Sequence, residues 1–188
     1  MMKHKKYKSL SDNALMEQFI RQRDPRVFAQ VYERHFVNLS KYITWLSQDI
    51  ALSKDITQTV LLKIFRNPQR FDTQKDFKVW LFVLARNQWK NQIRDIRTRE
   101  KYLTEIEQSK AMEVHPPKTE QQEERLTQIR KAIKGLSDHH QEVVTLKYIN
   151  NLTIKEISEI LECSEGTIKS RLFYALENLR NRITIQHA

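Results

Sequence analysis

Glycine and proline are scarce in this 188-residue sequence, which contains two glycines and four prolines. Proteins built from β-sheets need many tight turns, and such turns draw heavily on these two residue types. The scarcity argues against an all-β architecture and favours long helices joined by short connections. The sequence therefore predicts an all-α fold.

Cysteine is almost absent as well, and the single residue, Cys163, excludes an intramolecular disulfide. His139 and His140 are adjacent rather than spaced three or four residues apart on one helix face, so they do not predict a metal site. Gly135 and Gly166 are too far apart to form a phosphate-binding loop. The sequence suggests no pair of nucleophile and base. We expect a binding protein without cofactors, not an enzyme.

Long hydrophobic runs are missing too, so we expect no membrane insertion. The first ten residues, MMKHKKYKSL, are basic but are not followed by an apolar stretch, and they do not predict a signal peptide. We expect a cytoplasmic protein.

Positive charge is abundant and unevenly distributed. The chain has 33 Lys and Arg against 23 Asp and Glu, a net charge of +10. Residues 1–95 carry 18 basic and 9 acidic side chains, a net +9, and residues 125–188 carry 10 and 7, a net +3. Residues 96–124 between them carry 5 and 7, a net −2. Two basic parts around an acidic middle fit two modules that bind a polyanion such as nucleic acid.

The first half of the chain predicts a four-helix bundle over residues 1–99. A short helix fits residues 11–22, and Asp24 with Pro25 marks the start of a long second helix. The third helix should begin after Ser53 and end before Pro68, residues 67–75 should form a loop, and a fourth helix should run from about 76 to 99. Apolar residues recur along the second helix at helical spacing: Phe28, Val31, Tyr32, Leu39, Tyr42, Ile43 and Leu46.

Residues 100–118 are charged, end in two prolines and predict a linker to a second small domain, residues 119–188. In that domain Thr119 with Gln122, and Thr153 with Glu156, have the spacing of capping boxes. Gly135 should end the first helix, and Ser137 is a plausible cap for the next, which carries Val143, Val144, Leu146 and Tyr148.

A helix-turn-helix is predicted near residue 160. A helix of about two turns, Thr153 to Leu161, is followed by a three-residue joint and a longer helix capped by Ser164. On the second helix Ile168, Leu172, Leu176, Leu179 and Ile183 fall at intervals of three or four residues, and Ile168 and Leu172 should face inward. Six neighbouring side chains then project elsewhere, and Arg, Lys, Ser and Thr among them are suited to base edges or phosphates in a major groove: Thr167, Lys169, Ser170, Arg171, Phe173 and Tyr174.

Aromatic and basic residues alternate between residues 65 and 94, a pattern suited to unstacked bases. Phe65, Phe77, Trp80 and Phe82 fall near apolar helical positions and are expected in the core. The better surface candidates are the loop residue Phe71 and five residues on the polar face of the fourth helix: Arg86, Asn87, Lys90, Asn91 and Arg94.

Two stretches resemble the extracytoplasmic-function type of bacterial sigma factor. QEVVTLKYINNLTIKEISEILECSEGTIKSRLFYALENLR, from Gln141, is similar to the domain of that family that reads the minus-thirty-five promoter element. The pattern FDxxxxFKxWLxxxARN, from Phe71 to Asn87, is similar to the segment that binds and melts the minus-ten element. The resemblance implies a two-domain transcription initiation factor.

The resemblance also implies roles for particular residues. The six projecting residues of the helix-turn-helix would face the minus-thirty-five duplex. Phe71, Asp72, Lys75 and Lys78 would belong to the loop that captures a flipped minus-ten base, and Arg86, Asn87, Lys90 and Asn91 would follow the melted strand. Asp55, Gln58 and Lys63 would contact core RNA polymerase. An anti-sigma factor is a possible further partner, and the protein would act as a monomer.

Four positions depart from the family. Acidic residues are usual where this chain has Lys54 and Thr59, and aspartate is usual where it has Asn91. Glycine is usual in the turn where this chain has Glu162, and a left-handed Glu162 would cost about 1–2 kcal/mol.

Three alternatives remain open at this stage: a helix-turn-helix repressor or activator that acts without polymerase, a single-strand nucleic-acid binder, and a polymerase-binding adaptor without promoter specificity.

Overall fold

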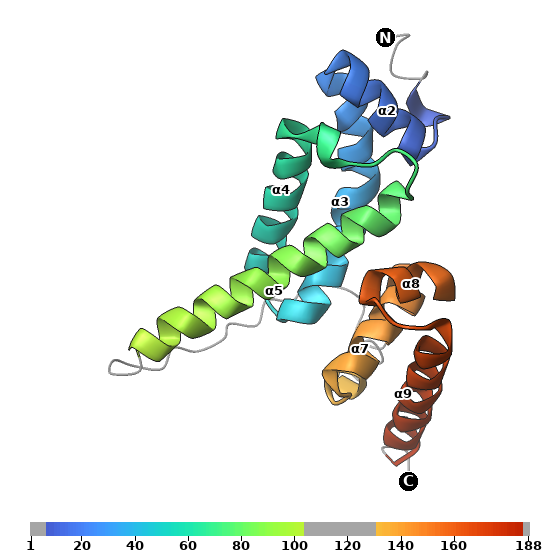
Figure 1. Ribbon diagram of the computed structural model, residues 1–188. Coiled ribbons are helices and arrows are strands. Elements are labelled where there is room, and N and C mark those ends of the chain that lie inside the picture. The colour runs from blue at the N-terminus through green and yellow to red at the C-terminus, as the bar shows by residue number, and fades with distance from the viewer. Residues whose placement is uncertain (1–6, 104–130, 186–188) are drawn as a thin grey trace, which may run out of the picture.

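The computed structural model describes residues 7–103 and 131–185, and within these two ranges the chain forms helices and turns but no strand. The first range contains α2, α3, α4, the short η1 and the long α5; the second contains α7, η2, α8 and α9 (Figure 1). The all-α prediction is confirmed. The predicted division into domains at residues 1–99 and 119–188, with a linker at 100–118, remains a prediction. The expected capping box of Thr119 and Gln122 lies outside the described residues.

Local caps set the start of the first two helices, and the cap at Asp24 is the predicted one. α2 (Asp12–Gln22) begins after Ser11, whose Oγ accepts from the N–H of Ala14 at 3.2 Å. α3 (Pro25–Ser47) begins after Asp24, whose Oδ1 accepts from the N–H of Arg26 at 2.9 Å.

α4 (Ile50–Arg66) begins earlier than predicted. Its N-terminal cap is Asp49, whose Oδ1 accepts from the N–H of Leu52 at 3.0 Å. Ser53, the expected start, is instead buried in the helix and accepts from the hydroxyl of Thr44 at 2.7 Å. η1 (Pro68–Arg70) follows as a single 3-10 turn in the predicted loop.

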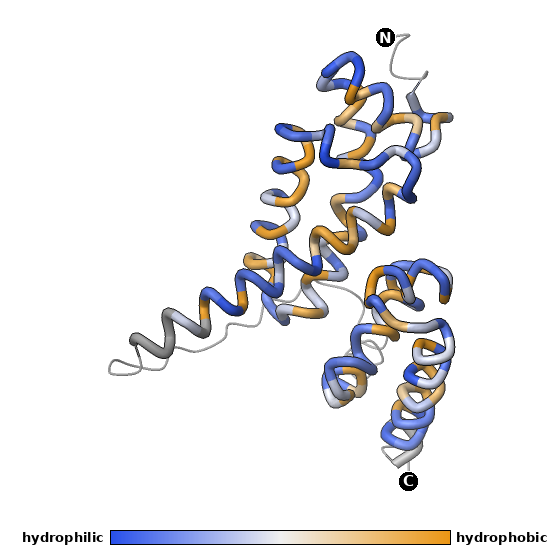
Figure 2. The backbone as a smooth tube through the Cα atoms, viewed as in Figure 1, coloured by the Kyte–Doolittle hydropathy of each residue, from blue (hydrophilic) through white to orange (hydrophobic). Residues whose placement is uncertain are grey.

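α5 (Phe77–Leu103) extends beyond the predicted end near residue 99. Its N-terminal half packs on the bundle, whereas the coloured part beyond it is mostly hydrophilic and projects away from the bundle (Figure 2). The exposed polar face expected for the fourth helix therefore lies where the helix leaves the core.

Large aromatic rings fill the centre of this unit. Phe19, Tyr42, Phe77 and Phe82 are almost completely buried, and each such ring stabilises the fold by about 1.5–3 kcal/mol. Tyr32 shares the helical spacing of the core residues of α3, but the residue is 39% exposed, and its ring stacks on that of Phe36 with 4.8 Å between the ring centroids.

The second unit begins with the end of a helix, residues 131–134, which stops at Gly135 as predicted. α7 (Asp138–Val144) follows Ser137, but that side chain makes no capping hydrogen bond. η2 (Thr145–Ile149) is a π-helical turn in which the N–H of Asn150 donates to the carbonyl of Thr145 at 3.1 Å.

α8 (Ile154–Leu161) and α9 (Glu165–Ile185) complete this unit. Ile168 and Leu172 are buried on α9 as predicted, whereas Leu176, which continues their spacing, is 43% exposed. Ala175 takes the inward position at the next turn.

The two units contact each other directly. α8 packs against α5, and η2 packs against α3 (Figure 1). The Nδ2 of Asn150 donates to the carbonyl of Asn38 at 2.8 Å, and the Nε2 of Gln141 donates to that of Trp45 at 3.0 Å. Side-chain amides of the second unit thus bind backbone carbonyls of α3.

Candidate nucleic-acid interface

The predicted helix-turn-helix is present as α8, a three-residue turn and α9. Thr153 N–H donates to Glu156 Oε2 at 2.6 Å and Glu156 N–H donates to Thr153 Oγ1 at 3.2 Å, which completes the predicted capping box. Glu162 ends α8 in the left-handed conformation, with φ 55° and ψ 44°. Ser164 caps α9 through its Oγ, which accepts from the N–H of Thr167 at 3.1 Å.

Most of the predicted groove-facing side chains are exposed. Lys169 and Ser170 lie at the surface of the second turn of α9, and Phe173 and Tyr174 follow with 65% and 54% of their surface exposed. The two rings meet edge to face, with 5.5 Å between their centroids. A cation, a hydroxyl and two rings are therefore available to a ligand along consecutive turns of α9.

Arg171 and Thr167 are half-buried. The Nη1 of Arg171 lies 3.9 Å from the sulfur of Cys163, which places the guanidinium beside the turn of the motif. The hydroxyl of Thr167 lies 2.9 Å from that of Ser164. Both side chains are thus oriented by the turn, and this arrangement reduces the conformational entropy that Arg171 would lose on binding.

The loop between α4 and α5 combines one buried aromatic residue with exposed polar residues. Phe71 was expected at the surface, and that expectation is wrong, because only 3% of the residue is exposed. Its ring packs against those of Phe77 and Trp80, with 5.2 Å between centroids in each pair. Asp72 and Lys75 are exposed. The loop thus offers these polar side chains to a ligand, while Phe71 supports it from below.

The predicted strand-binding face of α5 divides into two parts. Asn87, Lys90 and Asn91 are exposed around the middle of the helix. Arg86 and Lys78, by contrast, form ion pairs with the second unit. Lys78 Nζ lies 3.5 Å from Glu156 Oε1, a pair in which both side chains are half-buried.

Arg86 was expected on the surface, but its side chain is only 14% exposed, so that expectation is wrong. Its Nε donates to Glu142 Oε1 at 2.7 Å, and the same oxygen accepts from the hydroxyl of Tyr42 at 2.8 Å. Burial lowers the pKa of Arg86, but the Glu142 carboxylate outweighs it and the net shift is upward. Burial and the same carboxylate raise the pKa of Tyr42. Arg86 is a fixed cation held between the two units.

The positions expected to contact polymerase are all exposed on α4. Asp55 and Gln58 lie one turn apart, and Lys63 Nζ donates to Gln88 Oε1 of α5 at 2.6 Å. Leu62, one turn after Gln58, is an exposed apolar residue beside them, with 46% of its surface exposed. Leu62 is apolar but falls outside the helical spacing that buries Leu61 and Ile64, and this position is the sequence signal for its exposure.

Sequence reasoning missed Glu142 and Asn150, which hold the second unit against α3 and α5. Neither residue belongs to a recognisable local pattern, because their partners lie far away in the chain.

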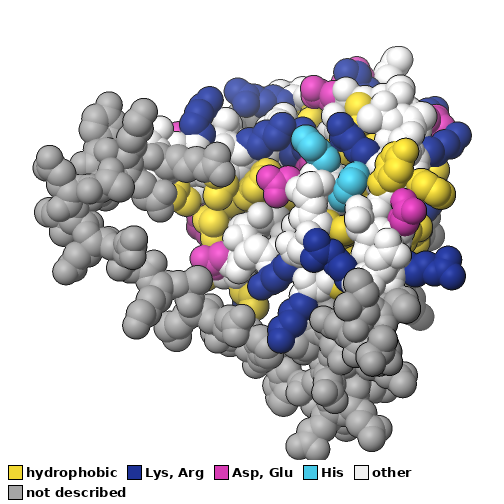
Figure 3. Space-filling view, turned by 90° about the horizontal axis from the view of Figure 1, so that it is seen from below, with side chains coloured by type: hydrophobic (Ala, Val, Ile, Leu, Met, Phe, Trp, Pro, Cys, Tyr) yellow, Lys and Arg dark blue, Asp and Glu magenta, His cyan; other side chains and the backbone are white. Residues whose placement is uncertain are grey.

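Seen from below, Lys and Arg side chains of the described residues occupy several places, with hydrophobic side chains between them (Figure 3). The positive charge on this face is distributed rather than gathered in one patch.

Within residues 7–103 and 131–185, no group of three or more His, Cys, Asp or Glu side chains has the arrangement of a metal site. None of the described helices has the length and apolarity to cross a bilayer.

Two family models match the chain. "Sigma-70 region 2" matches residues 31–99, which include α4, the loop and most of α5. "Sigma-70, region 4" matches residues 132–181, which include the helix-turn-helix.

The chain is similar to known proteins in sequence and in structure. The chain is 31% identical over 157 residues to the ECF RNA polymerase sigma factor SigL of Mycobacterium tuberculosis, covering 83% of this chain and 87% of SigL. It is 28% identical over 185 residues to the ECF RNA polymerase sigma-E factor of Haemophilus influenzae, covering 93% and 96%. Among solved structures, RpoE of Bartonella quintana, in complex with the anti-sigma factor NepR, superposes with a TM-score of 0.70 at 25% identity, covering 84% of this chain and 97% of RpoE.

Proposed function

The chain belongs to the extracytoplasmic-function family of RNA polymerase sigma factors, and we propose that it binds core RNA polymerase and directs it to promoters through two separate contacts with DNA. The observation that carries the proposal is that one chain holds both an exposed helix-turn-helix surface on α9 and an exposed polar face on α5 beyond the loop. A repressor needs only the first of these surfaces.

The contact with the minus-thirty-five element belongs to α9. Lys169 and Arg171 donate to guanine edges or phosphates, and Ser170 and Thr167 add hydroxyls at the end of the helix that enters the groove first. Phe173 and Tyr174 lie further along the helix and supply apolar contact area. The capping bonds of Thr153 and Ser164 support this role because they fix the start of both helices.

The contact with the minus-ten element belongs to the loop and α5. Extruding a base from the stack costs a few kcal/mol, so a receiving site must offset that cost with stacking and hydrogen bonds. Asp72 and Lys75 supply the polar rim, and Phe71 keeps its position by packing under the loop. Asn87, Lys90 and Asn91 then follow the melted strand.

This role requires the two units to separate. Arg86 and Lys78 are among the residues proposed to bind the melted strand. In the conformation described above, however, they form ion pairs with Glu142 and Glu156. Carboxylates at these positions compete with phosphates for the same cations. Binding of the melted strand therefore replaces the contacts between α5 and the second unit.

Polymerase contacts the face of α4 that carries Asp55, Gln58 and Lys63, extended by Leu62. We assign the protein to the cytoplasm, where its polymerase and promoter partners are found, and we regard it as a monomer without enzymatic activity of its own. The Bartonella relative was solved with an anti-sigma factor, and an anti-sigma factor is the corresponding regulatory partner here.

The test combines the purified protein with sigma-free core RNA polymerase and a pool of genomic promoter fragments, followed by mapping of transcript starts. Protein-dependent starts that share a two-part upstream motif are expected. Tight binding to intact duplex DNA without polymerase, together with no protein-dependent starts, would overturn the proposal in favour of a repressor or activator. Binding to polymerase without promoter choice would favour an adaptor, and binding only to single strands would favour a single-strand binder.

A further inference from the structure

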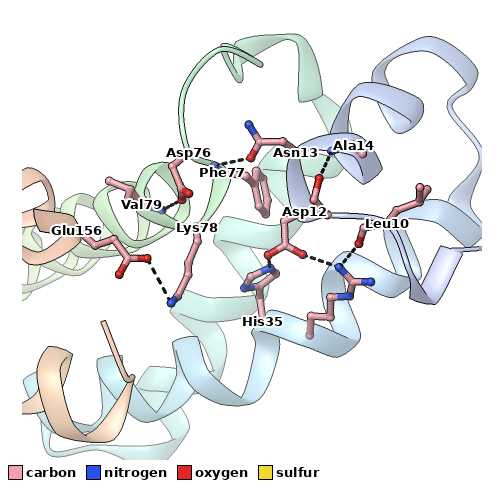
Figure 4. A network of polar contacts seen from close by, with 12 residues as sticks. Leu10, Asp12, Asn13, Ala14, His35, Asp76, Phe77, Lys78, Val79 and Glu156 are labelled. Atoms are coloured by element: carbon pink, nitrogen blue, oxygen red, sulfur yellow. Dashed lines mark hydrogen bonds and ion pairs between the residues drawn. The ribbon is translucent and has the colours of Figure 1, made fainter. Parts of the chain in front are cut away.

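α2 lies before the residues that the region 2 model matches, yet it contacts both ends of the loop between α4 and α5. At the N-terminal end of α2, Asn13 makes three hydrogen bonds to the far end of the loop. Its Nδ2 donates to the carbonyls of Thr73 at 3.1 Å and Lys75 at 2.6 Å. Its Oδ1 accepts from the N–H of Phe77, the first residue of α5, at 3.0 Å (Figure 4).

The near end of the loop is held by Arg23, at the other end of α2. Its Nη1 donates to the carbonyls of Phe65 at 3.3 Å and Arg66 at 3.4 Å, which lie at the C-terminus of α4. Its Nη2 donates to Gln69 Oε1 in η1 at 2.9 Å. A helix C-terminus carries partial negative charge, so a guanidinium is well placed there.

α2 is itself fixed to α3. The two oxygens of Asp12 accept from Arg34 Nη1 and pair with His35 Nε2, both at 2.8 Å (Figure 4). Leu15, Met16 and Phe19 bury the inner face of the helix. The bonds from Asn13 and Arg23 therefore originate from a rigid element and transmit its position to the loop.

From this geometry we infer that Asn13 is a positioning residue for recognition of the minus-ten element, and that it acts by holding the Thr73–Phe77 segment of the loop in its base-receiving conformation. The inference rests on the proposed function. Carbonyls at Thr73 and Lys75 that share one amide donor are fixed relative to each other and to the start of α5. The exposed Asp72 and Lys75 side chains then meet an extruded base without a further cost of ordering the loop.

Two variants separate positioning from folding. Asn13→Ala removes all three hydrogen bonds. Asn13→Asp removes the two donors to the loop but keeps an acceptor for the N–H of Phe77, and it places a carboxylate in the first turn of α2, where negative charge is favourable. We therefore expect Asn13→Asp to keep its thermal stability while releasing the loop. Gln18→Ala is the matched control, because Gln18 lies on α2 and bonds Gln22 rather than the loop.

The measurement is open-complex formation by reconstituted holoenzyme on a promoter identified by the start mapping, compared with variants altered in the minus-ten or the minus-thirty-five element. Both Asn13 variants should lower the preference for the intact minus-ten element by about three- to tenfold. The preference for the intact minus-thirty-five element should not change, and Gln18→Ala should resemble the wild type.

An unchanged minus-ten preference in both Asn13 variants would overturn the inference while leaving the proposed function intact. An equal loss of preference for both elements would overturn it too, since that result indicates a general structural role. Failure of the wild-type protein to initiate at any promoter would instead overturn the proposed function.

Discussion

Glu142 and Arg86 form an ion pair across the boundary between the two helical units, with 2.7 Å between Oε1 and Nε. The Glu142 side chain is 8% exposed and also accepts from the completely buried Tyr42 hydroxyl. One carboxylate thus satisfies two polar groups of the first unit that would otherwise be buried without a partner. Breaking this ion pair while the two units stay packed together would leave Arg86 buried without a partner, at a cost in free energy. Most of that cost is removed if the units separate and Arg86 returns to water.

Glu142→Ala should therefore separate the units rather than unfold them. Leaving a buried charge unpaired costs about 3–5 kcal/mol, and separation relieves most of that cost by hydrating Arg86. Small-angle X-ray scattering should give a larger radius of gyration for the variant, with an unchanged helical signal in circular dichroism. Glu177→Gln, at an exposed site on α9, is the control and should keep the wild-type dimensions. A variant that stays compact but loses several kcal/mol of stability would contradict this interpretation.

Features that depend on nearby residues were predictable from the sequence. Ser11, Asp24 and the pair Thr153–Glu156 cap their helices through bonds that span two or three residues, so spacing alone identifies them. The apolar period identified most of the core for the same reason. The start of α4 was less predictable, because Asp49 and Ser53 are both residues that can cap a helix and only the burial of Ser53 distinguishes them.

Exposure of single side chains was less predictable, because it depends on distant partners. Phe71 is covered by Trp80 and Phe77 once α5 folds over the loop. Arg86 is covered by Glu142, 56 residues later in the chain. The hydrogen bonds from Asn13 to the loop join residues 60 to 64 positions apart, and nothing in the local sequence of α2 indicates them. These contacts determine which candidate residues are free to bind DNA.

Glu162→Gly should stabilise the protein. Glu162 has φ 55°, a conformation that costs a residue with a Cβ about 1–2 kcal/mol and costs glycine almost nothing. Part of this gain is offset by the greater freedom of glycine in the unfolded chain, so we expect a net increase of about 1 kcal/mol in the free energy of unfolding. Urea denaturation at constant m-value measures it.

Glu159→Gly is the control for this substitution, because Glu159 is exposed in the interior of α8. Glycine there should destabilise by about 1 kcal/mol. Destabilisation of similar size at both positions would show that residue 162 is not left-handed in solution.

Asp12→Asn should change the response to acid. The hydrogen bond from His35 is the largest influence on Asp12, and with that from Arg34 it outweighs burial and lowers the pKa of the carboxyl from 3.8 to about 2. The ionised form is therefore favoured by the fold, and its stabilising contribution is complete above about pH 4 and is lost as the pH falls toward 2. The wild type should be more stable than Asp12→Asn near neutral pH, and this difference should close between pH 4 and 2.

Thermal unfolding of both proteins across this pH range is the measurement, with Asp95→Asn as the control at an exposed site on α5. A difference between wild type and Asp12→Asn that persists unchanged at pH 2 would show that the carboxylate charge does not carry the contribution.

Arg171→Ala should weaken promoter use in a sequence-dependent way. The guanidinium beside Cys163 is already oriented by the turn, so its contact with a guanine edge would be made with little loss of entropy. We expect a loss of about 1–3 kcal/mol on promoters with an intact minus-thirty-five element and a much smaller loss when that element is scrambled. Lys134→Ala removes the same charge from an exposed position elsewhere in the second unit and controls for the general attraction of DNA. Equal losses on intact and scrambled promoters would assign Arg171 to the phosphate backbone instead, and the slope of log affinity against log salt concentration should then fall by about one.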